Sequence, residues 1–188
     1  MVKPYLASVV TLIGVSGFIG IVIYLHFVQT DYDPAQQFMS ELALGRHGGM
    51  MFWAFLSFAL SIAAATRILH AYKAPLAVKG LTSVASLSML GAGVFELGAA
   101  TTLHVGLIAL AFFLLVLAMY FIPRVVPAFQ ARMAAAVCWG CAGGTALFVG
   151  LGVGLLPIGI SQRMAAVCLL LWLSWLALFD IKQKRGRQ

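Results

Sequence analysis

Long apolar runs separated by short polar segments occupy almost the whole chain. Two of these runs, at residues 5–28 and 50–72, have the length of one membrane-spanning helix. The other two, at residues 80–122 and 133–181, are about twice as long: residues 80–122 would form a helix of about 65 Å, twice the roughly 30 Å hydrocarbon core of a bilayer. Such a double run must fold back, and small residues or Pro and Gly mark the expected reversals at Leu97–Thr102 and Leu156–Arg163. The pattern therefore predicts six membrane-spanning helices, at about 5–28, 50–72, 80–97, 102–122, 133–156 and 163–181.

The distribution of positive charge predicts how these helices are oriented. Of the 12 Lys and Arg residues, only Arg46 and Arg163 fall at the end opposite the chain termini. Cytoplasmic loops are the ones enriched in Lys and Arg, so both termini are expected in the cytoplasm and the protein in the cytoplasmic (inner) membrane. The basic start Met1–Tyr5 runs into a long apolar stretch without a small-residue cleavage site, which predicts an uncleaved first helix.

Composition excludes a soluble fold. The chain is 63% hydrophobic and 9% charged, against about 45–50% and about 25% in soluble domains. The net charge of +7 indicates the orientation of the helices in the membrane. The sequence has no basic stretch interleaved with aromatic residues, the pattern typical of nucleic-acid binding. Membrane lipids, and not nucleic acid, are therefore the expected partners. A homo-oligomer and a partner membrane subunit both stay open. The predicted fold class is an all-α integral membrane protein: one domain over residues 1–188, a six-transmembrane helix bundle with a short interfacial helix in its first extracytoplasmic loop.

That loop follows the first helix and has a capped-helix signature. Asp33 is a typical N-cap, followed by Pro at the first helical position and by Gln36 as a capping-box partner. A short helix is predicted over Pro34–Leu44, ended by Gly45. One interpretation is a plain connector. The other is a lid over an outward-facing pocket, with its polar side chains turned inward: Ser40, Glu41, Arg46 and His47.

A polar pair is predicted beside the reversal between the third and fourth helices. Glu96 lies inside an apolar stretch, where an ionised carboxylate is costly unless it is paired or hydrated. His104 begins the next helix, so the two side chains are expected to meet at one depth. The alternative is that Glu96 extends to the headgroup region and has no partner in the protein.

The chemistry that these residues could perform stays open at this point. Acid–base catalysis on a lipid headgroup would use Glu41 or Glu96 with His104. A metal site would need three or four of five side chains to converge: His26, His47, His104, Glu41 and Glu96. No pre-formed ligand spacing favours it. A haem between two of these histidines fits poorly near the helix ends. The cofactor is therefore unknown.

Cys138-Trp139-Gly140-Cys141 matches the CxxC redox pattern. It lies on a helix in the apolar part of the chain, whereas a reactive thiol needs an accessible, electropositive setting. These cysteines, and Cys168, are expected to be inert.

Two short motifs resemble a prokaryotic membrane-protein family of unknown function, domain of unknown function 998. They are Asp31-Tyr32-Asp33-Pro34 with Ser40-Glu41-Leu42, and Gly93-Val94-Phe95-Glu96 followed by His104. The chain departs from the family pattern at Glu96, where the family usually has proline. The resemblance implies a six-span fold over nearly the whole chain and points to Ser40, Glu41 and His104, but it implies no activity.

Three functions remain as hypotheses. In the first, the protein binds a lipid or small amphiphile in an extracytoplasmic pocket lined by Ser40, Glu41, Arg46, His47, Glu96 and His104. In the second, the same site is a membrane enzyme acting on lipid headgroups. In the third, the protein is an accessory or structural subunit whose polar residues only hold helices together.

Overall fold

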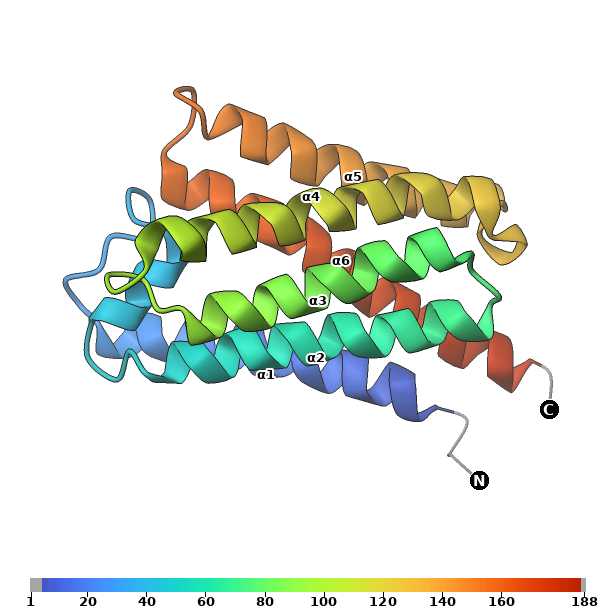
Figure 1. The fold of residues 1–188 in the computed structure, drawn as a ribbon, viewed down its shortest axis with the longest axis horizontal. Helices are drawn as coiled ribbons and strands as arrows, with labels where there is room; N and C mark the ends of the chain where they lie inside the picture. Colours follow the sequence, from blue (N-terminus) through green and yellow to red (C-terminus); the bar gives the residue numbers. More distant parts are fainter. Residues whose placement is uncertain (1–4, 187–188) are drawn as a thin grey trace.

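The computed structural model is a bundle of six helices lying side by side (Figure 1). It describes residues 5–186. The helices are α1 (Leu6–Val28), α2 (Met50–Ala71), α3 (Leu76–Val94), α4 (Thr101–Val125), α5 (Arg132–Leu151) and α6 (Ile158–Arg185). Each is long and apolar enough to cross a membrane, which confirms the predicted fold class.

Each helix packs against its neighbour in sequence, and α6 packs against α1 and α2, which closes the bundle. The most buried spans are α2 and α6, with 56% and 50% of their most apolar window buried, compared with 28% for α1 and α5. Large side chains such as Phe58, Leu115 and Trp172 fill the centre. Apolar residues also cover most of the outer surface of the helices, as expected where lipid is the solvent.

The bundle has two distinct ends (Figure 1). The loop end holds the first loop (residues 29–49), the α3–α4 turn (residues 95–100) and the α5–α6 turn (residues 152–157). The terminal end holds the start of α1 and the end of α6. Most basic residues lie toward the terminal end: Arg67, Lys73, Lys79, Arg124, Arg132, Lys182, Lys184 and Arg185. Lys3 and Arg187, also expected there, lie outside the described residues.

The α5–α6 turn lies earlier in the chain than predicted. Helix α5 ends at Leu151, and α6 begins at Ile158 directly after its N-cap, Pro157. Gly154 has a φ of +95°, a conformation that glycine adopts without steric cost. The expected reversal at Leu156–Arg163 is therefore wrong, and Arg163 lies inside α6.

The first loop contains less helix than predicted. Only Met39–Leu44 is helical, as the 3₁₀ segment η1, and residues 34–37 form a turn. The extended backbone of Phe38, with φ −60° and ψ 144°, separates the two parts. A continuous helix cannot form because the carbonyl oxygen of Ala35 accepts hydrogen bonds from the start of α6 instead.

Candidate functional site

The first loop lies over the start of α6 and is held there by backbone hydrogen bonds. The carbonyl oxygen of Ala35 accepts from the N–H groups of Gly159 (3.0 Å) and Ile160 (3.3 Å). The first N–H groups of a helix have no partner within the helix, so the loop satisfies two of them. A Cβ atom at Gly159 would lie only 2.4 Å from the carbonyl oxygen of Pro34. The close approach of the two backbones therefore requires glycine at this position.

Arg163 joins α6, the first loop and α1 through its guanidinium group. Its Nη1 atom donates to the carbonyl oxygens of Gln37 (3.2 Å) and Gly159 (2.9 Å). Its Nη2 atom donates to the hydroxyl of Tyr32 and to Nε2 of His26 (3.2 Å). We call Arg163, Tyr32 and His26 the Arg163 cluster. The apolar pattern does not predict this cluster because it places Arg163 in a reversal; Pro157, as a helix-starting residue, is the signal that could have placed it in α6.

Tyr32 connects Arg163 to the backbone of the first loop. Its hydroxyl donates to the carbonyl oxygen of Phe38 (2.9 Å) while it accepts from Arg163. Burial raises the pKa of the Tyr32 phenol above its ordinary value of 10.0, and the hydrogen bond and charge of Arg163 oppose that rise less strongly. The phenol is therefore neutral at physiological pH and remains a donor.

Glu41 caps the 3₁₀ helix of the first loop. Its Oε1 atom accepts the backbone N–H of Phe38 (2.8 Å), and its Oε2 atom accepts from the side-chain amide of Gln37 (3.1 Å). Only the Glu41 half of a capping box forms here, because the Phe38 side chain has no acceptor atom. Of the box predicted at Asp33 and Gln36, the Asp33 half forms, since its Oδ1 accepts the N–H of Ala35 (2.8 Å). The Gln36 half is wrong: Gln37 makes the contact with the N–H of Asp33. Both oxygens of Glu41 are occupied by bonds that shape the loop.

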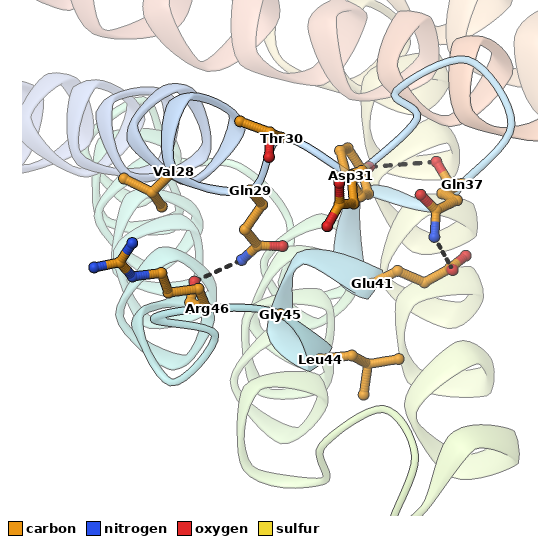
Figure 2. Close-up of a pocket in the computed structure, with 10 residues that line it drawn as sticks. Val28, Gln29, Thr30, Asp31, Gln37, Glu41, Leu44, Gly45 and Arg46 are labelled. Carbon is orange, nitrogen blue, oxygen red and sulfur yellow. Dashed lines mark hydrogen bonds between the residues drawn. The ribbon is translucent and has the colours of Figure 1, made fainter.

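A cleft of about 450 Å³ opens at the loop end beside Glu41 and Arg46 (Figure 2). The amide of Gln29 forms one side of it and donates to the carbonyl oxygens of Leu42 and Arg46, both at 2.8 Å. The guanidinium of Arg46 extends away from Glu41, and Arg46 forms no salt bridge with a described residue. The structure therefore brings two of the predicted ligand residues to one cleft, with their charged groups apart.

His104 and Glu96 do not form the predicted pair. His104 is 1% exposed, and its Nδ1 lies 2.7 Å from the carbonyl oxygen of Ala92 and 2.9 Å from that of Phe95. These are carbonyls at the end of α3, which lack partners within the helix, so the imidazole joins α3 to α4. Its Nε2 has no partner among the described residues, and Glu96 is exposed.

The other two histidines considered as ligands, His26 and His47, have separate partners. His47 is exposed, and its Nδ1 lies 2.7 Å from the hydroxyl of Tyr24. His26 belongs to the Arg163 cluster. Within residues 5–186, no group of three or more His, Cys, Asp or Glu side chains is placed to hold a metal ion. The three histidines weighed as metal or haem ligands thus do not converge.

An apolar groove of about 430 Å³ lies between α4, α5, α6 and the first loop. We call it the α4–α5–α6 groove. Its walls come mainly from aliphatic and aromatic side chains: Val105, Ile108, Ala109, Phe112, Phe113, Val116, Ala146, Val149 and Ile158. Four polar side chains also line it: Ser40, Thr145, Ser161 and Gln162. Of the predicted ligand residues, only Ser40 lies in this groove.

A buried acid at the terminal end was not singled out by the sequence pattern. Asp180 of α6 is 0% exposed, and its Oδ2 accepts from the hydroxyl of Ser8 (2.5 Å) and the ammonium of Lys184 (2.6 Å). The i, i+4 spacing of Asp180 and Lys184 is the signal that could have found this pair. The three cysteines, Cys138, Cys141 and Cys168, are free thiols.

Comparison with known proteins places the chain in a family. No curated protein and no solved structure gives a significant match. The model of a family described as "Protein of unknown function (DUF998)" matches residues 12–178. This match covers most of the chain and confirms the resemblance seen in the motifs of the first loop and the α3–α4 turn. The chain therefore belongs to the DUF998 family of proteins of unknown function.

Proposed function

We propose that the protein binds a membrane amphiphile, with its acyl chain in the α4–α5–α6 groove and its polar group beside Ser40 and Gln162. The observation that supports this proposal is the groove itself. Its volume of about 430 Å³ lies within the roughly 300–1,000 Å³ of small-molecule sites, and its mostly apolar walls are typical of such sites.

The loop-end part of the groove offers hydrogen-bond donors. Ser40 is 4% exposed and lines the groove, so its hydroxyl can donate to a polar group bound there. The Oε1 atom of Gln162 accepts the backbone N–H of Met39 (2.6 Å), which leaves the amide –NH₂ as a donor. Buried polar groups are normally hydrogen-bonded. An ester carbonyl, carboxylate or phosphate oxygen of an amphiphile would satisfy both.

The proposed orientation places this site in the outer half of the cytoplasmic membrane. Basic residues gather at the terminal end, and the positive-inside rule assigns such an end to the cytoplasm. The groove is lined by the loop-end parts of α4, α5 and α6, so an acyl chain would enter it from the outer leaflet.

The test is binding of oleic acid and of oleoyl lysophosphatidylcholine to the detergent-purified protein, followed by native mass spectrometry. Ala146→Trp fills the groove from α5 and should weaken binding of both probes at least about tenfold, or roughly 1.4 kcal/mol. Leu147→Trp is the matched control: Leu147 is 57% exposed and does not line the groove. Ser40→Ala should weaken binding by about 3- to 10-fold through the lost hydrogen bond. Equal affinity of wild type and Ala146→Trp would show that the proposal is wrong.

A further inference from the structure

A second groove lies on the opposite side of α6, between α6 and α1, with a volume of about 400 Å³. We call it the α1–α6 groove. Apolar side chains from both helices form its walls, including Val22 and Ile23 of α1 and Val167 and Leu170 of α6. His26 and Arg163 stand at its loop end. The groove therefore combines a long apolar surface with a cation at one end.

No described carboxylate forms a salt bridge with Arg163, although Glu41 and Asp33 lie close enough to act on the Tyr32 hydroxyl that Arg163 contacts. All four of its hydrogen-bond acceptors are neutral: two backbone carbonyls, a phenol and an imidazole. The one salt bridge in residues 5–186 joins Lys184 to Asp180, at the other end of the bundle. The four neutral acceptors use the four N–H groups of Nη1 and Nη2, so the N–H of Nε is the donor left for a ligand. A charge-assisted hydrogen bond to a phosphate oxygen is stronger than one to a neutral acceptor, which favours an anionic ligand.

His26 fixes the position of the guanidinium at the groove. Its Nδ1 lies 2.6 Å from the carbonyl oxygen of Val22, and since a carbonyl only accepts, Nδ1 must hold the proton. Nε2 is then the acceptor for Nη2 of Arg163. The imidazole thus orients the cation and adds no competing negative charge.

We propose that the α1–α6 groove binds an anionic phospholipid of the bilayer, with its phosphate against Arg163 and an acyl chain along the apolar walls. This site is separate from the amphiphile site and does not depend on it. Met39 lines the α1–α6 groove, whereas its neighbour Ser40 lines the α4–α5–α6 groove. The two grooves therefore meet the first loop on opposite sides of α6.

The test is lipid binding by native mass spectrometry of the full chain with phosphatidylglycerol and with phosphatidylcholine of the same acyl chains. Wild type should bind phosphatidylglycerol at least about tenfold more tightly. Arg163→Gln should abolish that preference, whereas Arg163→Lys should retain part of it because the charge remains. Val167→Trp fills the groove and should weaken binding of phosphatidylglycerol to the level of phosphatidylcholine, so that the preference is lost. Leu178→Trp, at an exposed site on the same helix nearer the terminal end, should change nothing.

The proposal is overturned if wild type binds both lipids equally, or if Val167→Trp keeps the preference for phosphatidylglycerol. Circular dichroism and gel filtration check that each variant folds. If Arg163→Gln does not fold, Val167→Trp decides, because Val167 is 43% exposed and its side chain makes none of the contacts that hold the loop. Binding of oleic acid by Val167→Trp should equal that of wild type, so that failure at this groove is distinct from failure at the α4–α5–α6 groove.

Discussion

Each end of the bundle contains one charged side chain of α6 in a largely apolar setting, but the two ends treat that charge differently. At the terminal end, Asp180 is paired with the ammonium of Lys184 and the hydroxyl of Ser8. At the loop end, Arg163 meets only neutral acceptors. The charge of Asp180 is compensated by a salt bridge within the protein, whereas Arg163 has no salt-bridge partner among the described residues and could bind an anionic ligand.

Aromatic packing is denser at the terminal end. Near the terminal end, the rings of Tyr72, Phe129, Trp175 and Phe179 contact one another, with Phe129 and Phe179 centroids 5.1 Å apart. At the loop end, the first loop leaves two grooves and a cleft open. A cleft of about 380 Å³ is open at the terminal end as well, where Tyr72, Asp180 and Lys184 are among its lining residues. The two ends therefore differ in how their charges are compensated, and our proposals assign ligand binding to the loop end.

The largest expected effect concerns a loop-end residue that we interpret as structural. His104→Ala removes hydrogen bonds to two carbonyls and leaves a cavity against Phe55, so it should lower the free energy of unfolding by about 2–4 kcal/mol. Glu96→Gln, at an exposed site, should change it by less than about 0.5 kcal/mol. Unfolding in mixed micelles measures both. A folded, stable His104→Ala that loses lipid would instead make His104 a ligand residue.

The contact between the first loop and α6 gives the next largest effect. Gly159→Ala places a Cβ 2.4–2.7 Å from three loop carbonyl oxygens, and such overpacking costs about 1–3 kcal/mol. Because Ser40 of the first loop lines the α4–α5–α6 groove, the displaced loop should also weaken oleic acid binding. A variant that loses stability alone would not show this second effect. Gly140→Ala is the control, since nothing lies within 4 Å of its added Cβ, and it should be neutral or slightly stabilising.

A substitution of Asp180 tests the terminal end of the bundle. Asp180→Asn removes the charge that pairs with Lys184 and should cost about 1–2 kcal/mol, a modest value because the Lys184 side chain is 28% exposed. Lipid and oleic acid binding should equal those of wild type. A change in lipid preference in this variant would contradict the assignment of ligand chemistry to the loop end.

The smallest effect is a dependence on alkaline pH. Burial raises the pKa of Tyr32 above 10.0 in the folded protein, so the folded state holds the phenol proton more tightly than the unfolded state. The resulting stability is fully present below the unfolded pKa and is lost as pH rises through the folded pKa. Tyr32→Phe should cost about 1 kcal/mol at about pH 8. At about pH 11, the difference from wild type should shrink. Parallel pH profiles for the two proteins would exclude this role for Tyr32.

The helices are predictable from the sequence because long apolar runs have few alternatives in a bilayer. The six spans and the α3–α4 turn at Gly98 follow from run length and small residues. The start of α6 is not predictable in this way, because Arg163 inside an apolar run is easily taken for the edge of a membrane-spanning helix. The first loop has a helix-capping pattern over its whole length, but tertiary bonds from Gly159 and Ile160 take the carbonyl that a continuous helix would need.

The candidate site is less predictable, since it depends on contacts between distant segments. Motifs in the first loop point to Ser40 and Glu41, and these residues line the groove and the cleft. The Arg163 cluster has no sequence signature, because an arginine that donates to backbone carbonyls requires no particular residue opposite it. Chain reversal alone suggests that Glu96 and His104 meet, yet the imidazole turns to the backbone of α3 instead.

The bond between Arg163 and Gln37 spans 126 residues, which has a consequence for the synthesis of the protein. At about 5–20 residues per second, a ribosome needs roughly 6–25 s to make the intervening chain. During that time the first loop has been made, but its partner helix does not yet exist. The loop end of the bundle can therefore close only after the last helix has been made, and until then the polar backbone of the first loop depends on water or on the insertion machinery.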